Sequence, residues 1–185
     1  MKTCRPFFGL KTLIVGDVNT GKTSYTQLLL LECRGQKSMI VLDMAPEEVK
    51  NIGGKMRVPQ DPNIHYVTTQ IRPPRLRAQN DAAALRIARE NAAAIERNLF
   101  TRAESIPAEA LIVNDVSLYL QAGSPKRLYQ VMERFHTVIL NGYLGNTFPD
   151  GQLTRIERKN MEWLIRHCDQ VIETERDIPS NLREE

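Results

Sequence analysis

The chain has 185 residues, of which 42% are hydrophobic and 25% charged, and a formal net charge of +3. This length predicts a single domain with room for a layered core, and the composition is that of an ordinary globular protein. The small net charge does not indicate nucleic-acid binding. No apolar run reaches membrane-spanning length, and Lys11 interrupts the apolar stretch near the N-terminus, so we expect a cytoplasmic protein without an export signal.

Short apolar segments alternate with helical ones along the chain. Six segments predict strands: Thr12–Val15, Met39–Asp43, Ile64–Thr68, Leu111–Asp115, Thr137–Asn141 and Gln170–Glu173. Four predict helices: Lys22–Cys33, Asp81–Ala103, Ser124–His136 and Leu153–Cys168. Most of the strands are rich in Val and Ile without polar alternation, which is typical of strands covered on both faces. The sequence therefore predicts a three-layer α/β fold with a mainly parallel sheet of about six strands and helices on both faces.

A glycine-containing loop separates the first predicted strand from the first predicted helix. Residues 16–23 match G-x-x-x-x-G-K-[ST], the phosphate-binding loop or Walker A motif, in the strand–loop–helix context that such a loop requires. The nucleotide-binding residues predicted from this match are Gly16, Asp17, Val18, Asn19, Thr20, Gly21, Lys22, Thr23 and Ser24.

Each residue type in the motif has a chemical reason. Gly16 and Gly21 allow a turn whose backbone N–H groups form a nest for anionic oxygens, and the helix that follows adds its partial positive charge. Lys22 can reach the β- and γ-phosphates of a nucleotide. The Thr23 hydroxyl can take a place on Mg²⁺. We therefore expect a Mg²⁺–nucleotide complex, with ATP as the nucleotide and GTP not excluded.

Three polar residues at the ends of other predicted strands are candidates for chemistry. Asp115 is the preferred second Mg²⁺ ligand beside Thr23, because P-loop enzymes use an Asp that ends a neighbouring apolar strand. Asp43 also ends such a strand, and its alternative interpretation is a turn former before the next segment. Asn141 is placed to sense the γ-phosphate or orient an attacking group, unless its Gly-containing segment only reverses the chain. With Lys22, these form the predicted catalytic set.

Two segments do not fit the alternating pattern. Pro46–Pro62 contains Gly53, Gly54 and one further proline, Pro59, and predicts a loop with at most one short helix. Thr69–Asn80 contains Arg72, Arg75 and Arg77 without an acidic residue, and predicts either a mobile lid that closes over phosphates or an anionic acceptor, or a solvated loop. The polar tail 175–185 is expected to fray. We assign 1–185 to one nucleotide-binding domain.

The motif identifies the chain as similar to the P-loop NTPase superfamily. In layout it also resembles the cobinamide kinase / cobinamide-phosphate guanylyltransferase family, from the N-terminal loop through Val116–Leu120 and Asn141–Gly145 to the last helix and strand at 155–171. This resemblance implies phosphate binding at residues 16–23 and a RecA-like strand order. The family's guanylylated histidine has no counterpart, because residues 44–63 contain no His.

The favoured function is therefore an ATP-dependent, kinase-like phosphotransferase for a small molecule, or an NTP hydrolase. The absence of a Glu after Asp115 speaks against a motor-type ATPase, and the absence of D-x-x-G and N-K-x-D motifs speaks against a regulatory GTPase. The alternative is a switch or assembly factor in which ATP controls a protein partner. Nucleic acid and membranes are not expected as partners, and oligomers remain open.

Overall fold

The computed structural model describes residues 5–47 and 54–174. Six parallel strands form one sheet in the order β3-β2-β4-β5-β1-β6. They are β1 (Lys11–Gly16), β2 (Met39–Asp43), β3 (Ile64–Thr68), β4 (Ala110–Asn114), β5 (Thr137–Tyr143) and β6 (Gln170–Glu173). This result confirms the predicted α/β fold. With β5 between β1 and β4, the order also agrees with the RecA-like arrangement that the sequence favoured.

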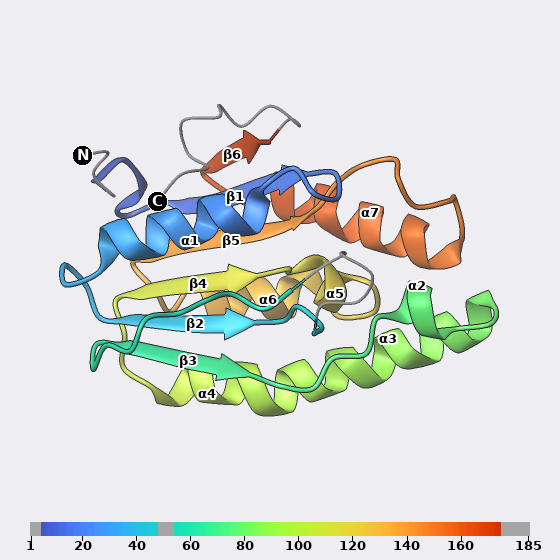
Figure 1. Cartoon of the computed structure of the whole chain (residues 1–185), viewed down its shortest axis with the longest axis horizontal. Coiled ribbons are helices and arrows are strands. Elements are labelled where there is room, and N and C mark those ends of the chain that lie inside the picture. The colour runs from blue at the N-terminus through green and yellow to red at the C-terminus, as the bar shows by residue number, and fades with distance from the viewer. Residues whose placement is uncertain (1–4, 48–53, 175–185) are drawn as a thin grey trace.

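Helices cover both faces of this sheet (Figure 1). Those helices are α1 (Lys22–Cys33), α2 (Pro74–Arg77), α3 (Asp81–Ile95), α4 (Thr101–Ser105), α5 (Ser117–Leu120), α6 (Pro125–Met132) and α7 (Gln152–Ile165). A 3₁₀ turn η1 (Arg5–Phe7) precedes β1, and a π-helical turn η2 (Glu96–Phe100) joins α3 to α4. Helix α1 packs on one face, and α3, α5, α6 and α7 pack on the other. No helix in the described part of the chain is long and apolar enough to cross a membrane.

The central strands bury side chains on both faces, which explains their unbroken apolar sequences. In β1, Leu13 belongs to the core beneath α3 and α5–α7, whereas Ile14 belongs to the core beneath α1. In β4, Leu111 and Ile112 divide between the same two cores. All four side chains are buried. Because successive strand residues point to opposite faces, a strand between two helical layers must be apolar at every position.

Several predicted boundaries differ from the observed ones. Strand β5 extends two residues past its predicted end at Asn141, to Tyr143, so Asn141 lies inside the strand and not at its last position. Strand β4 ends at Asn114, and Asp115 follows it in the left-handed conformation with φ of 56°. The helix predicted over 81–103 is interrupted by the π turn. Ser124 caps α6 as expected, because its side chain accepts a hydrogen bond from the Arg127 backbone.

The basic segment 69–80 contains the short helix α2, which the sequence did not predict. The tail 175–185 and residues 48–53 of the predicted Pro46–Pro62 loop lie outside the described residues. In Figure 1 the arrowheads of all six strands point the same way. The segments that follow β1, β2, β4 and β5 therefore emerge at one edge of the sheet, where α/β proteins place their ligand sites.

Candidate functional site

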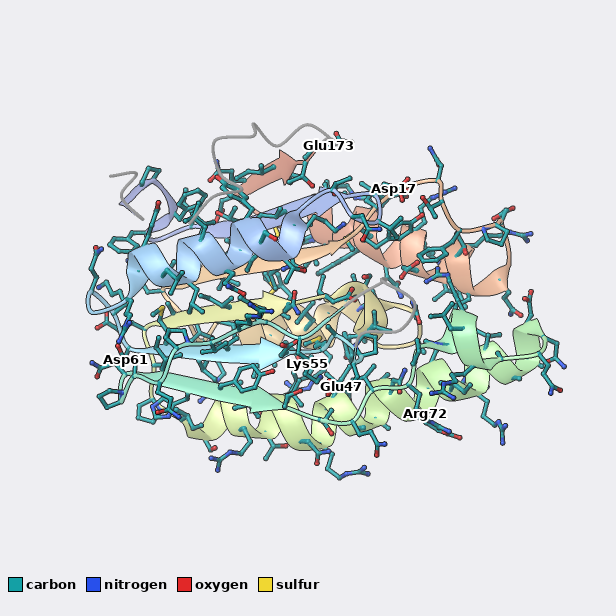
Figure 2. All side chains as sticks on the ribbon, viewed as in Figure 1. Asp17, Glu47, Lys55, Asp61, Arg72 and Glu173 are labelled. Carbon is teal, nitrogen blue, oxygen red and sulfur yellow. The ribbon has the colours of Figure 1, made fainter. Side chains whose placement is uncertain are left out.

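A cavity of about 450 Å³ lies at this edge of the sheet. The glycine loop, residues 16–23, and the start of α1 form one wall, and Asp115 and Asn141 at the ends of β4 and β5 contribute to the cavity lining. Further lining residues come from α2, α5 and α7. Figure 2 shows Asp17, after β1, and Lys55, near the end of β2, on the same side of the molecule. Residues far apart in the sequence thus share one enclosed space.

The glycine loop is held in a tight conformation. A Cβ at Gly16 would lie 2.5–2.7 Å from Thr174 and the Thr20 hydroxyl, so no larger residue fits there. Asn19 and Gly21 have φ of 56° and 80°, in the left-handed region that favours Gly and tolerates Asn. The Thr20 hydroxyl donates to the Asp17 carbonyl at 2.9 Å, closing the loop on itself.

Lys22 bends back over this loop. Its Nζ donates to the Asp17 carbonyl and, at 3.4 Å, to the Thr20 hydroxyl. Burial lowers the pKa of Lys22, and the nearby carboxylates of Asp115 and Asp17 act in the opposite direction. Burial of the ammonium is therefore only partly compensated. An anion bound in the cavity would supply the missing compensation.

The first turn of α1 opens into the same cavity. Its N-cap is Gly21, which has no side chain to accept from the helix N–H groups, and the first turn contains no acidic residue. Lys22, Thr23 and Ser24, which form this turn, line the cavity. A helix end with uncapped N–H groups and a partial positive charge favours an anion.

The loop after β5 braces the glycine loop from outside. The Asp17 carboxylate accepts hydrogen bonds from the backbone of Val18 and Asn146. A Cβ at Gly145 would collide with the Asp17 carboxylate, so the close approach requires Gly at position 145. The Gly-containing segment after Asn141 thus approaches the glycine loop closely, with the Asp17 carboxylate as its neighbour.

Asp115 lies in the cavity beside Lys22. Its backbone N–H donates to Asn141 Oδ1 at 2.9 Å, and its Oδ1 accepts from the Ser117 hydroxyl. Burial, reinforced by the Glu157 carboxylate, raises the pKa of Asp115 to about 6, although Ser117 and Lys22 favour the ionised form. Asn141 therefore acts here as a positioning residue for the strained Asp115 backbone.

A chain of buried side-chain amides links three strands behind this cavity. Asn114 Oδ1 accepts from Asn141 Nδ2 at 3.0 Å and from the Thr23 hydroxyl at 3.2 Å. The second Asn141 Nδ2 bond goes to the Thr26 hydroxyl of α1 at 2.8 Å. Asn114 Nδ2 in turn donates to Asp43 Oδ1 at 2.9 Å. The Thr23 hydroxyl thus contacts Asn114, while Asp115, its predicted partner on Mg²⁺, lines the same cavity.

Asp43 has a different environment from the other candidates. Its side chain is fully buried, and it is not among the residues that line the cavity. Its four hydrogen-bond donors, two on each carboxylate oxygen, are Asn114 Nδ2, Tyr66 OH and the backbone N–H groups of Ala45 and Met56. A carboxylate with two donors on each oxygen is well suited to hold strand ends together. This geometry favours the turn-forming interpretation of Asp43 over a catalytic one.

The residues present fit a Mg²⁺ ion held mainly by phosphate and water. No cluster of three acidic, His or Cys side chains with metal-binding geometry occurs among residues 5–47 and 54–174. Mg²⁺ needs no such cluster, because it usually takes one or two protein oxygens and completes its shell with phosphates and water. Thr23 and Asp115 both line the cavity. The Thr23 hydroxyl donates its proton to Asn114, which leaves its lone pairs for a cation.

Sequence reasoning missed the far side of the cavity. Arg75 of α2 lines it and pairs with Glu157 of α7, a buried carboxylate that also accepts from Gln121 Nε2 at 3.0 Å. Arg72 pairs instead with Glu90 at the surface. Glu90 lies on the next helix, α3, and Glu157 lies 82 residues from Arg75, so neither acid belongs to the basic segment itself. The only available signal was Glu157 on an otherwise apolar helix face.

The hydrogen bonds of Asp43 predict a stability effect. Replacement of Asp43 by Asn puts an NH₂ group against two donors in either amide orientation, so the free energy of unfolding should fall by about 2–3 kcal/mol. Chemical denaturation measures this. Asp150→Asn is the matched control, since Asp150 is exposed in a surface ion pair and should change stability by less than about 1 kcal/mol. Equal effects of the two variants would contradict the structural role.

The raised pKa of Asp115 predicts a pH effect of defined sign. Between pH 4 and 6 the folded protein retains a proton that the unfolded chain has released, so stability should fall as pH rises through this window. Asp115→Asn, which does not titrate, should gain a few degrees in unfolding temperature relative to the wild type between pH 4 and 7. Thermal unfolding at several pH values measures the difference. A constant difference would show that Asp115 titrates normally.

Comparison of the sequence with models of known protein families and with curated proteins gives no match.

Proposed function

We propose that the chain binds a nucleoside triphosphate with Mg²⁺ at residues 16–24 and transfers its γ-phosphoryl group to a small molecule or to water. The observation that supports this most is one shared cavity. The uncapped start of α1, the Lys22 ammonium, the Thr23 hydroxyl and the Asp115 carboxylate all border it. Anion-binding and cation-binding groups that face one space match a magnesium–phosphate complex better than either ion alone.

The chain's own residues can carry out most of such a reaction, because phosphoryl transfer depends mainly on positioning and on charge stabilisation. The N–H groups of the glycine loop and α1 would hold the phosphates. Lys22 would leave its contact with the Asp17 carbonyl and pair with phosphate oxygens. Thr23 and Asp115 would hold Mg²⁺, which neutralises charge on the β- and γ-oxygens when bound. Asn141 and Ser117 would keep Asp115 in place.

Transfer to a small molecule is favoured over simple hydrolysis. Beyond the glycine loop, the cavity continues along side chains that include Leu118, Phe148 and Tyr143, which are poor hosts for an isolated water molecule. The residue after Asp115 is Val116, which is buried, and no acidic side chain at that position can activate water. A pocket beside the phosphates that is partly apolar favours a second organic substrate.

The charge of Lys22 predicts a loss of nucleotide affinity on truncation. Lys22→Ala should weaken ATP binding by about 1.5–3 kcal/mol, or roughly ten- to 150-fold, because it removes a charge-assisted contact. Calorimetric titration with MgATP measures this. Lys159→Ala, at an exposed position on α7, is the control and should bind as the wild type does. Unchanged affinity in Lys22→Ala would remove the central claim.

Mg²⁺ dependence separates the roles of the two aspartates. Asp115→Asn should lose most of the difference between ATP affinity with and without Mg²⁺, whereas Asp43→Asn should keep that difference in whatever fraction remains folded. Titrations in EDTA and in Mg²⁺ give the two affinities. The reverse ranking would identify β2, and not β4, as the strand that supplies the metal ligand. Binding without turnover on any acceptor would favour the switch interpretation.

A further inference from the structure

The cavity has a second region, lined mainly by residues of α2, α5 and α7. We call this region the far pocket. Its lining residues are Arg75, Leu76, Leu118, Gln121, Tyr143, Phe148 and Glu157. The groups assigned above to phosphate and Mg²⁺ are Lys22, Thr23 and Asp115. Both sets of residues line one cavity, so the far pocket is adjacent to the proposed phosphate position.

Gln121 in this pocket has an unmet hydrogen-bonding group. Its side chain is 1% exposed, and Oε1 is the one buried side-chain polar atom without a partner in the described part of the chain. The amide cannot improve this by rotating, because Nε2 donates to Glu157 Oε1 at 3.0 Å and a flip would set two acceptors against each other. Glu157 thus fixes the orientation of the Gln121 amide, and Oε1 stays buried in the cavity wall without a donor.

A buried carbonyl without a donor is costly, so its presence in a cavity wall points to a ligand. Burial of an unpaired acceptor costs about 1–3 kcal/mol, which a ligand N–H or O–H donor would recover. The same atom would penalise a ligand that presents only acceptors, because like partial charges would meet in a dry site. Sites that hydrogen-bond a substrate in this way discriminate strongly against analogues that lack the donor.

The charges of the far pocket disfavour an anion. Arg75 is the cation in this wall, and Glu157 already neutralises it through two guanidinium nitrogens. The Arg75 guanidinium also lies 4.4 Å from the centre of the Phe148 ring. A second carboxylate, Asp115, lines the same cavity. The far pocket thus has more hydrogen-bond acceptors than unpaired donors. An anionic phosphoryl acceptor, which the Arg-rich sequence suggested, is therefore not favoured.

Apolar side chains complete the pocket. Leu118, Leu76 and Phe148 border it together with the Tyr143 ring, which packs against Phe148 with a centroid distance of 4.9 Å. Leu76 is 37% exposed and is one of only four large exposed hydrophobic side chains in the described regions. Such a surface binds an apolar or aromatic body of a few carbon atoms.

We propose that the far pocket binds the second substrate, a neutral or cationic molecule with an apolar body and a hydroxyl or amino group that donates to Gln121 Oε1. This proposal rests on the proposed function, for which it supplies the class of phosphoryl acceptor. Gln121 is then the specificity-determining residue for the acceptor. Glu157 acts through Gln121 and Arg75 as a positioning residue.

Four ring compounds of similar size test this assignment: benzyl alcohol, benzylamine, anisole and benzoate. The first two carry a donor, anisole carries only an acceptor, and benzoate is an anion. We expect both donor compounds to bind the wild-type protein about five-fold more tightly than anisole, and benzoate to bind most weakly. NMR titration of the nitrogen-15-labelled protein gives the affinities, and the Gln121 side-chain amide signal reports the contact.

A matched pair of variants tests the role of Gln121 directly. Gln121→Met keeps the length of the side chain and removes the carbonyl, so the advantage of the donor compounds over anisole should disappear. Gln130→Met makes the same change at an exposed position on α6 and should preserve the advantage of the donor compounds over anisole. If Gln121→Met does not fold, the order of the four compounds on the wild type still decides. Equal binding of all four, tightest binding of benzoate, or an unchanged Gln121 signal would overturn the proposal.

The test does not depend on nucleotide binding. The four compounds are titrated without ATP, so a failure of the Lys22→Ala experiment would leave the far pocket result interpretable. If ATP binds as proposed and the donor compounds do not, the far pocket proposal alone is wrong. If the donor compounds bind and ATP does not, the far pocket is a binding site and the proposed phosphotransferase function is wrong.

Discussion

The side chain of Asn114 is the contact on which the candidate site depends. It joins Asp43 at the end of β2, Asn141 in β5 and Thr23 at the start of α1: its Nδ2 donates to Asp43, and its Oδ1 accepts from both Asn141 and Thr23. Parallel strands have no hairpin to fix their ends relative to one another. A buried amide that donates to one strand and accepts from the next supplies that constraint. Because the network is fully satisfied, it also rigidifies the edge of the sheet where the cavity forms.

From this network the geometry of the cavity follows in order. Asn141, held by Asn114 and Thr26, presents its Oδ1 to the backbone of Asp115. That contact holds Asp115 at a φ that is uncommon for a residue other than Gly. The carboxylate then lines the same cavity as Lys22. Strain of this kind persists only where the surroundings over-determine it, and here the buried amides provide that surrounding.

Charge compensation connects the two sides of the cavity. Lys22 is held by carbonyl and hydroxyl oxygens of the glycine loop, and burial lowers its pKa, so the loop side carries a cation without full compensation. On the other side Glu157 neutralises Arg75, and Glu157 also raises the pKa of Asp115. The loop side therefore suits an anion, and the far pocket suits a ligand that carries a hydrogen-bond donor. This asymmetry would orient a phosphate donor and an acceptor in one cavity.

The sequence was sufficient for the fold and for the location of the glycine loop. Strands buried on both faces leave an unbroken apolar signal, as Leu111 and Ile112 do, and the alternation with helices specifies a parallel sheet. The loop motif encodes its own conformation, with Gly21 at positive φ. These features depend on residues that are close in sequence, so they can be recognised from the sequence alone.

The network and the far pocket could not be found in this way. Asn114 seemed to be an ordinary residue before Asp115, because its partners Thr23, Asp43 and Asn141 lie on three other elements. Arg75 seemed to lack a counterion, since Glu157 is 82 residues away. The extension of β5 past Asn141 to Tyr143 depended on pairing with β1, in which Gly16 lies opposite Tyr143. Each of these features is a tertiary contact between segments distant in sequence.

The most direct test of the account is a crystal structure with Mg²⁺ and a non-hydrolysable ATP analogue. We predict that the β-phosphate oxygens accept hydrogen bonds from the backbone of residues 19–23, that Lys22 turns from the Asp17 carbonyl to the phosphates, and that Mg²⁺ contacts Thr23 directly and Asp115 directly or through water. A nucleotide bound elsewhere, or a glycine loop that stays closed by Lys22 at saturating analogue, would contradict the account.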